Sequence, residues 1–200
     1  MPEQLNFKAQ SFLNKFVAGV DEVGRGSLFG DVVAAAVVLD VKKPINGLSD
    51  SKKLTGGQRE RVFQEIQDLA LFWSVGRASA KEIDSVNILQ ASLLAMTRSV
   101  RGLSIRPSFI YIDGLHTPSW DYPSKAVVKG DSLIPCIAAA SIVAKVTRDR
   151  EMLAMDVRYP GYGFAENKGY PTKQHLQALK QLGPCHMHRT SFSPVSALIK

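Results

Sequence analysis

Hydrophobic residues along the chain fall into two patterns. Short apolar runs lie between glycine and proline residues and are rich in β-branched and aromatic side chains, which is typical of β-strands. Longer segments carry apolar residues at every third or fourth position, which is typical of helices. The short runs predict strands at about residues 16–22, 31–40, 70–78, 108–113 and 125–129.

Local signals mark the ends of the helical segments. Thr55 is a suitable N-cap for a helix that ends near Leu69, and Gly183-Pro184 stops the last helix. The predicted helices are residues 55–69, 79–100, 135–155 and 172–182. Consecutive early strands followed by alternating strands and helices predict an α/β fold, a mixed β-sheet flanked by helices, with a small helical C-terminal extension from about residue 160. The length fits a single domain over residues 1–200.

Two adjacent carboxylates end the first predicted strand. Neighbouring side chains of a strand point to opposite faces, so we expect one of Asp21 and Glu22 to turn toward the interior or a cleft. A buried acid needs a cation or hydrogen-bond donors, which makes a divalent metal ion a reasonable partner. The alternative is that the two acids only end the strand and start a polar turn.

A glycine-flanked arginine follows these acids. Gly24, Arg25 and Gly26 lie in the connection to the second apolar run, and two glycines there permit positive φ angles. They also let backbone N–H groups approach a ligand without a Cβ in the way. The alternative is that the glycines serve only the geometry of a strand-to-strand turn.

Two further acids close later segments of the chain. Asp113 closes residues 109–113 and Asp131 closes residues 126–131, each beside a glycine. If these strands are neighbours in one sheet, the two acids converge with Asp21 and Glu22 on one site. Four clustered acids repel one another, so such a site requires Mg²⁺ or Mn²⁺, which prefer oxygen ligands. The alternative is three unrelated turns, because Asp-Gly and Gly-Asp are ordinary turn pairs.

Composition and charge describe a globular, basic chain. Apolar residues make up 45% of the sequence, which argues against disorder, and the formal net charge is +7. The excess is uneven, because residues 121–200 carry 11 Lys and Arg against 6 Asp and Glu. This part of the chain is expected to attract a polyanion such as nucleic acid.

The two cysteines and the apolar runs bear on location and on zinc. Cys136 and Cys185 form no CxxC pair, which favours a reduced, cytoplasmic setting, and no apolar run is long enough for a signal peptide or a membrane span. The segment Cys185-His186-Met187-His188 has no second ligand pair at a suitable spacing, which argues against zinc. We therefore expect a soluble protein with no membrane partner.

A set of short motifs spans about residues 17–195. Its members are Val20-Asp-Glu-Val-Gly-Arg-Gly26, Asp50-Ser-Lys-Lys-Leu54, Tyr111-Ile-Asp-Gly114, Val128-Lys-Gly-Asp-Ser132, the segment from Ala138 to Asp149, Tyr162-Gly-Phe164, Lys168-Gly-Tyr170, His188-Arg189 and Ser191-Phe192. In content and order this set resembles the bacterial type 2 ribonucleases H, the ribonuclease HII family. Each motif is weak alone, whereas the ordered set is highly specific.

The resemblance implies a metal-dependent endoribonuclease on a ribonuclease H-like fold. Such an enzyme hydrolyses the RNA strand of RNA/DNA hybrids and incises 5′ of ribonucleotides embedded in duplex DNA, leaving 5′-phosphate and 3′-hydroxyl ends. By this match the catalytic, metal-binding carboxylates are Asp21, Glu22, Asp113 and Asp131. Two Mg²⁺ or Mn²⁺ ions roughly 4 Å apart would activate water and stabilise the leaving oxygen.

The resemblance also implies substrate-binding residues. Gly24, Arg25 and Gly26 match the family turn that recognises the ribonucleotide 2′-hydroxyl, the group that separates RNA from DNA. Tyr170 matches the family tyrosine placed against the adjoining deoxyribose; the alternative is an aromatic anchor of a loop. The candidate phosphate contacts are Lys52, Lys53, Lys145, Arg148 and Lys168, although each is individually more often a solvated surface charge. Asp149 is a fifth acid that could equally pair with Lys145 or Arg148.

The chain departs from the family pattern at four positions. Ser27 and Asp31 stand where many relatives have proline, which predicts a less rigid loop and an added negative charge near the site. Asn167 replaces a frequent histidine and Thr190 a frequent basic residue. The lack of an additional N-terminal domain argues against ribonuclease HIII.

Two other function classes remain open on the sequence alone. One is a hybrid-binding protein without turnover, although the presence of all four acids speaks against it. The other is a related metal-dependent nuclease that acts on DNA junctions. The enzyme is expected to be a monomer whose partners are RNA/DNA hybrids and ribonucleotide-containing duplex DNA.

Overall fold

A mixed five-stranded sheet forms the centre of the molecule. The computed structural model describes residues 16–48 and 54–199, and the strand order is β3-β2-β1-β4-β5. Neighbouring strands are antiparallel from β3 to β1 and parallel from β1 to β5. The strands are β1 (Val17–Val23), β2 (Val32–Val38), β3 (Phe72–Ala78), β4 (Phe109–Asp113) and β5 (Ser124–Val127).

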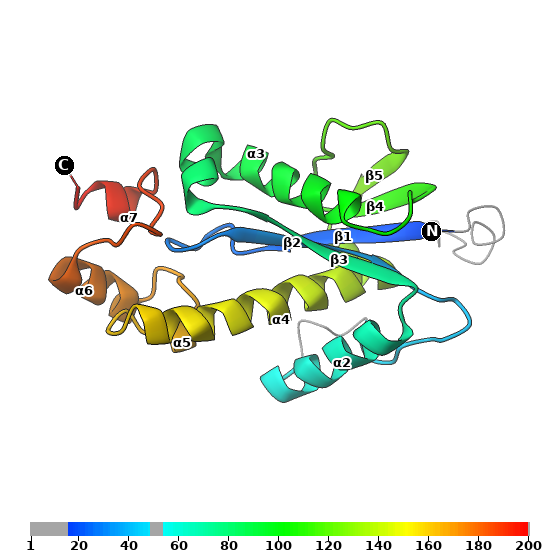
Figure 1. Ribbon diagram of the computed structural model, residues 1–200, viewed down its shortest axis with the longest axis horizontal. Helices are drawn as coiled ribbons and strands as arrows, with labels where there is room; N and C mark the ends of the chain where they lie inside the picture. The colour runs from blue at the N-terminus through cyan, green and yellow to red at the C-terminus, as the bar shows by residue number, and fades with distance from the viewer. Residues whose placement is uncertain (1–15, 49–53, 200) are drawn as a thin grey trace, which may run out of the picture.

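Helices cover both faces of this sheet. Figure 1 shows α3 (Ala80–Arg101) on one face and α4 (Pro135–Arg158) on the other, with α2 (Gly56–Leu69) packed against α4. Side chains of strand β2 alternate between the two faces of the sheet. Ala34 and Ala36 pack into the core under α3, whereas Ala35 and Val37 pack into the core under α4. The predicted α/β class, with a mixed sheet flanked by helices, is confirmed.

Two glycines let the helices approach the sheet closely. A Cβ on Gly19 of β1 would lie 2.1 Å from the backbone of Cys136 in α4. A Cβ on Gly76 of β3 would lie 2.2 Å from the Ala95 carbonyl in α3. Neither position has room for a side chain. Glycine at position 19 therefore allows α4 to lie directly on β1, the strand that carries the first two acids.

Helix α3 is interrupted where the sequence predicts one continuous helix. Asn87 has φ 71° and ψ 165°, and its side chain accepts hydrogen bonds from the N–H groups of Leu89 and Gln90. An asparagine that caps the following residues explains the break, since this side chain competes with the helix backbone. The short first part of α3, which contains Asp84, is thereby turned toward the C-terminal segment.

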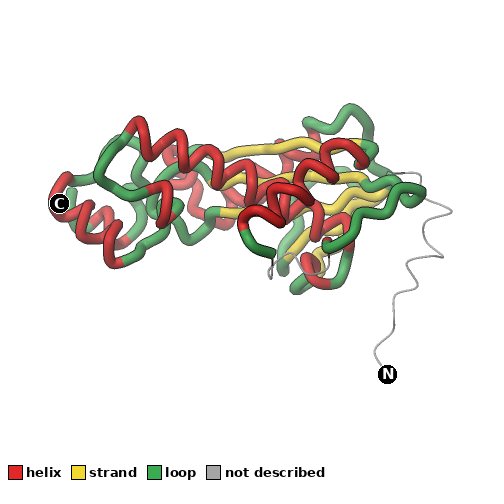
Figure 2. Tube along the Cα trace, turned by 90° about the horizontal axis from the view of Figure 1, so that it is seen from below, coloured by secondary structure: helices red, strands yellow, loops and turns green. Residues whose placement is uncertain are grey.

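The C-terminal residues form the predicted helical extension. It consists of α5 (Phe164–Asn167), α6 (Lys173–Leu182) and α7 (Ser193–Ser196), which lie beyond the end of the sheet in Figures 1 and 2. Its core contains Leu28 and Phe29 from the connection after β1, together with Met152 from α4. The extension therefore packs on the turn that follows the first two acids. None of the helices in residues 16–48 and 54–199 is long and apolar enough to span a membrane.

Candidate active site

Asp21 and Asp113 come from adjacent parallel strands. Val20 of β1 is paired with Ile112 of β4, and both belong to the core under α3. The next residue of each strand is an aspartate, so both aspartates turn to the opposite face, toward α4. The sheet thus brings together two acids that are 92 residues apart in the sequence.

Asp21 lies in an electrostatically unfavourable environment. Its side chain is buried, with 7% of the residue exposed. Burial raises the pKa of this carboxyl well above its usual value, and the negative charges of Glu22 and Asp113 raise the pKa further. Opposing this, the Ser141 hydroxyl and the Glu22 N–H donate hydrogen bonds to the carboxylate, the latter at 2.7 Å. The prediction that one of the two adjacent acids turns inward is confirmed.

Glu22 is held by the neighbouring turn. Arg25 Nη1 lies 3.1 Å from Glu22 Oε1, and the glutamate side chain is 10% exposed. Burial raises the pKa of Glu22, and Asp113 adds to this, whereas the Arg25 charge opposes it. The arginine between the two glycines therefore partly neutralises the acidic cluster.

Asp131 lies in a turn and not at a strand end. Strand β5 stops at Val127, and Asp131 lies in a 3-10 turn, η2 (Gly130–Ser132), which corrects the prediction that it ends a strand. Lys129 has φ 55°, which bends the chain into this turn. The Asp113 carboxylate accepts a hydrogen bond from Gly130 N at 2.6 Å and a longer one from Asp131 N at 3.4 Å. Asp113 thus fixes the turn that carries the fourth acid.

The donor set of these four residues suits a hard cation. In the described part of the chain, no three His, Cys, Asp or Glu side chains stand close enough together to hold one metal ion. All four candidates nevertheless offer carboxylate oxygens, which Mg²⁺ and Mn²⁺ prefer. The mutual repulsion at Asp21 is also the kind of charge crowding that a cation relieves.

The glycines of the following turn have different surroundings. Gly24 has φ 90°, and a Cβ there would lie 2.3 Å from Arg148 Nε. A Cβ on Gly26 would lie 3.8 Å from a ring carbon of Tyr170, an ordinary contact. Gly24 thus serves the fold of the turn, whereas Gly26 and Tyr170 face each other across an open edge.

Arg148 holds the turn from within the protein. Its residue is 0% exposed, and its guanidinium donates to the carbonyls of Phe29, Asp31 and Lys168. It also donates to Ser27 Oγ at 2.8 Å. The prediction that Arg148 contacts phosphate is wrong for this structure, because every part of the guanidinium is enclosed by protein.

Arg189 is a second buried clamp on the same turn. It donates to the carbonyls of Gly30 and Arg25, at 3.0 and 2.9 Å, and its backbone N–H donates to the Leu28 carbonyl. Its Nη2 has no hydrogen-bond partner in the part of the chain that the structure describes. Burial and then the Arg148 charge lower the pKa of Arg189. Two cations from distant segments thus share the task of fixing this turn.

Two departures from the family pattern strengthen loops instead of loosening them. Ser27 is fully buried, and its Oγ donates to the Phe29 carbonyl while it accepts from Arg148. The expected loss of rigidity at this position is therefore wrong. Asn167 donates to the Tyr162 carbonyl and accepts from Gly169 N, both at 2.7 Å. It shapes the loop that leads to Tyr170.

The other two departures bind other parts of the protein. Burial raises the pKa of the Asp31 carboxyl, and the negative charge of Glu151 raises it further. The positive charges of Arg77 and Arg189 oppose this rise. Thr190, with Ser191, donates backbone and hydroxyl hydrogen bonds to the Asp84 carboxylate, at 2.5 to 2.9 Å. The C-terminal segment is thereby attached to the first part of α3.

The predicted lysines differ in what they contact. Lys145 is paired with Asp149 at 2.7 Å, one turn along α4. The Lys168 ammonium donates to the Ala165 carbonyl. Lys52 and Lys53 lie outside the described residues.

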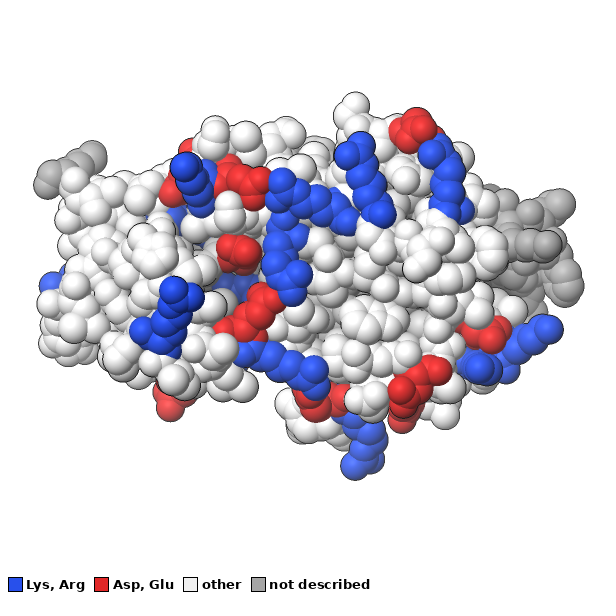
Figure 3. Space-filling view, in the orientation of Figure 1, with Lys and Arg blue, Asp and Glu red and all other residues white. Residues whose placement is uncertain are grey.

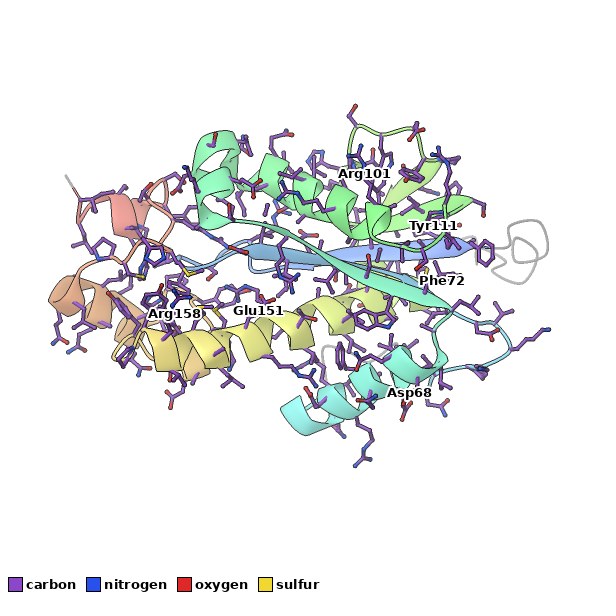
Figure 4. All side chains as sticks on the ribbon, viewed as in Figure 1. Asp68, Phe72, Arg101, Tyr111, Glu151 and Arg158 are labelled. Atoms are coloured by element: carbon purple, nitrogen blue, oxygen red, sulfur yellow. The ribbon has the colours of Figure 1, made fainter. Side chains whose placement is uncertain are left out.

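Charges on one face of the molecule are largely paired. Figure 3 shows basic and acidic side chains side by side over the middle of this face. Arg98 bonds Glu82 and Arg77 bonds Glu151, each at 2.6 Å, and Glu151 is labelled on α4 in Figure 4. The positive excess of the chain is therefore not displayed as a continuous basic surface on this face.

Sequence reasoning missed Ser141 and Arg189 as residues of the site. Ser141 lies in the quoted segment from Ala138 to Asp149, and the alanines around it were the signal of a helix packed closely on a strand. Arg189 lies in the quoted His188-Arg189 motif. A single buried arginine has no sequence pattern that distinguishes it from a surface arginine, so only its place in a motif pointed to it.

Comparison with known proteins adds a family to this geometry. The model of the ribonuclease HII family matches residues 18–195 of the chain. A ribonuclease HII from Alteromonas mediterranea is 53% identical over 188 residues, which cover 94% of this chain and 99% of that protein.

Solved structures share the fold. The ribonuclease H2 from Pyrococcus horikoshii OT3 superposes with a TM-score of 0.76 and 30% identity, covering 92% of this chain and 96% of that one. The ribonuclease HII in the PCNA complex from Archaeoglobus fulgidus gives a TM-score of 0.75 and 25% identity, covering 89% and 95%. The similarity includes both the sheet and the C-terminal extension, because it spans nearly the whole of each chain.

Proposed function

Because the chain belongs to the ribonuclease HII family, and is therefore an endoribonuclease of the ribonuclease H type, we propose two activities for it. It hydrolyses the RNA strand of RNA/DNA hybrids. It also incises duplex DNA on the 5′ side of embedded ribonucleotides. The products carry a 5′-phosphate and a 3′-hydroxyl. The proposal is carried by one observation, the placement of Asp21 and Asp113 side by side on two parallel strands.

Four carboxylates supply the proposed metal site. Asp21, Glu22, Asp113 and Asp131 would hold Mg²⁺ or Mn²⁺, and two bound ions would supply activated water and charge stabilisation for the departing 3′ oxygen. Arg25, which is paired with Glu22 in this structure, would then be available to a phosphate. Ser141 keeps the buried Asp21 carboxylate in place, because its hydroxyl donates to it.

The turn after β1 supplies the proposed selectivity for ribonucleotides. Backbone groups of Gly24, Arg25 and Gly26 recognise the 2′-hydroxyl, and the two buried arginines keep this backbone fixed. Tyr170 faces Gly26 and packs against the deoxyribose on the 3′ side, which favours an RNA-to-DNA junction. Of the lysines predicted to contact phosphates, the structure describes Lys145 and Lys168, and we propose this role for both.

We further propose that the chain acts as a monomeric single domain in the cytoplasm. The support for this location is the state of the two cysteines, which are both free.

A cleavage assay tests the proposal directly. End-labelled duplex DNA containing one ribonucleotide is incubated with the purified protein and Mg²⁺, Mn²⁺ or EDTA, beside an all-DNA duplex and a long hybrid. Metal-dependent incision 5′ of the ribonucleotide alone supports the proposal. Cleavage of the hybrid but not of the single-ribonucleotide duplex would contradict the junction part of it.

Replacing single carboxylates tests the site. Asp21→Asn and Asp113→Asn are expected to reduce kcat by about a thousandfold or more, because each removes a ligand oxygen charge. In EDTA both variants should be at least as stable as the wild type, since the substitution removes a repelling charge from a buried cluster. Melting temperatures and kcat are measured together. Near-normal activity in either folded variant would contradict the metal assignment.

A further inference from the structure

Two histidines outside the proposed catalytic site form a hydrogen-bonded pair in the interior. His175 of α6 and His188 of the C-terminal segment are 0% and 1% exposed, and their Nε2 atoms lie 3.2 Å apart. At the other end of each ring, Nδ1 of His188 lies 3.0 Å from Cys185 N and Nδ1 of His175 lies 3.0 Å from the Tyr170 carbonyl oxygen.

The partners of these rings determine where the protons lie. Cys185 N–H is a donor, so Nδ1 of His188 accepts and the proton of the neutral ring lies on Nε2. That proton is donated to Nε2 of His175, which leaves the His175 proton on Nδ1. Nδ1–H then donates to the Tyr170 carbonyl. The four groups form one directional relay from Cys185 to Tyr170, in which every polar hydrogen has an acceptor.

The surroundings keep the pair neutral. The rings of Phe29 and Phe164 pack against His188, and burial lowers the pKa of both histidines, that of His188 to about 4. The ionisable groups that face the pair are the Tyr162 phenol and the Cys185 thiol, and burial raises the pKa of each. The neighbouring Arg189 turns its guanidinium away, to the turn after β1.

The relay ends on the backbone of the tyrosine that faces Gly26. Apart from the histidine, the Tyr170 carbonyl accepts only a tight-turn bond from Thr172 N in the described chain, and Tyr170 N donates to Asn167. The Tyr170 ring lies against Gly26 and is 5.6 Å from the Arg148 guanidinium. His175 thus adds a side-chain hydrogen bond from the core of the C-terminal extension to the backbone bonds that Asn167 and Thr172 make with this tyrosine.

We propose that His175 and His188 are positioning residues, which fix Tyr170 opposite Gly26 and thereby set the preference of the enzyme for an RNA-to-DNA junction over a long hybrid. This inference rests on the proposed function, in which Tyr170 packs against the deoxyribose. A shift of this tyrosine changes the alignment of a junction substrate, whereas a long hybrid, which offers a ribose at that position, depends less on it.

Two substitutions of His175 separate positioning from general stability. His175→Leu removes the donor to the Tyr170 carbonyl. His175→Asn keeps it, because an amide N–H takes the place of Nδ1–H, while the link to His188 is lost. Leu179→Ala is the matched control, since Leu179 is equally buried on α6 in the same core and makes no bond to Tyr170.

The readout is kcat and KM on a single-ribonucleotide duplex and on a long RNA/DNA hybrid. His175→Leu is expected to lower the junction-to-hybrid ratio of kcat/KM on the order of tenfold, mainly through kcat. His175→Asn, which keeps the donor to Tyr170 but loses the link to His188, is expected to lower the ratio less than His175→Leu, and Leu179→Ala is expected to leave it unchanged. The inference would be overturned if His175→Leu left the ratio unchanged, or if Leu179→Ala lowered it by the same factor.

A second measurement tests the relay without activity. Nitrogen NMR of the histidine rings in the full-length protein reports which nitrogen of each ring is protonated, and the expected pattern is Nε2–H for His188 and Nδ1–H for His175. Any other pattern overturns the inference. If the wild-type protein cleaves neither substrate, the proposed function is refuted, and the junction role with it. If the enzyme cleaves both substrates but its selectivity does not change on substitution of His175, only this inference is refuted.

Discussion

Single residues of the turn after β1 show how one short motif divides its tasks. Gly24 has a left-handed backbone and touches the Arg148 side chain, so its hydrogen is a requirement of packing. Among the residues that the structure describes, Gly26 has no such neighbour and meets only the ring of Tyr170. The same residue type therefore serves the fold at one position and is available to the substrate two positions later.

Alanine at each glycine is expected to separate these two tasks. Gly24→Ala should cost about 2 kcal/mol or more in the free energy of unfolding, because of its φ angle and the contact with Arg148. Gly26→Ala should change it by less than about 0.5 kcal/mol, while kcat/KM on a single-ribonucleotide duplex falls at least about tenfold, since the methyl group occupies the space assigned to the ribose. Urea denaturation and the cleavage assay measure the two effects. Equal loss of stability in both variants would contradict the division.

At the scale of elements, α4 links the two halves of the site. Its first turns lie on β1 at Gly19 and bring Ser141 to Asp21, and its later turns bring Arg148 to the turn after β1. The metal-binding and the substrate-binding parts of the proposed site are thus fixed to one helix.

Loss of the buried arginine should be far more costly than loss of an exposed arginine on the same helix. Arg148→Met removes the guanidinium donor from the Asp31 and Lys168 carbonyls and from Ser27 Oγ, and we expect it to destabilise the protein by about 3 kcal/mol. Arg150→Met, two residues along, breaks an exposed ion pair with Glu60 and should cost less than about 1 kcal/mol. Urea midpoints with unchanged slopes give the difference. Similar midpoints for the two variants would show that Arg148 is not a clamp.

The elements were predictable to the extent that their information is local. The apolar run of β2 and the cap at Thr55 predicted a strand and a helix close to their observed bounds. The buried state of Arg148 was not predictable, because its partners lie far away in the sequence. The break at Asn87 has a local cause, the capping of Leu89 and Gln90, which the spacing of apolar residues did not reveal. The four carboxylates could be named as candidates from the ends of the predicted segments, but the case for their convergence rested on the family motifs, since strand order has no signature in spacing.

At the scale of the whole molecule, the C-terminal extension completes the turn that begins near residue 24. Gly169 and Met187 accept hydrogen bonds from Leu28 and Gly30, and Arg189 donates to the same segment. The core of the extension contains the neutral histidine pair, which connects the stability of this part of the molecule to pH.

Mild acid is expected to destabilise the protein. The pKa of His188 is lowered from 6.5 to about 4 in the fold, so below about pH 6.5 the unfolded chain binds a proton that the folded chain rejects. Stability attributable to this residue is present above pH 6.5 and decreases as pH falls toward 4, by a total on the order of 3 kcal/mol.

Melting temperatures between pH 7.5 and 4 measure this loss. His188→Asn, which retains the acceptor for Cys185 N, should show a flatter pH dependence, and His116→Asn, on an exposed loop, should follow the wild type. Parallel curves for the wild type and His188→Asn would show that the pair does not carry the acid sensitivity.

The arginine clamp has a consequence for synthesis of the chain. Arg189 bonds the Gly30 carbonyl across 159 residues of sequence, so the turn after β1 is made early and acquires this partner late. At a ribosomal rate of roughly 5–20 residues per second, the interval is on the order of ten seconds. During that time the strands can pair, but the turn after β1 is not yet held by Arg189. We expect a protease to cleave the nascent chain at this turn until the segment that contains Arg189 has left the ribosome.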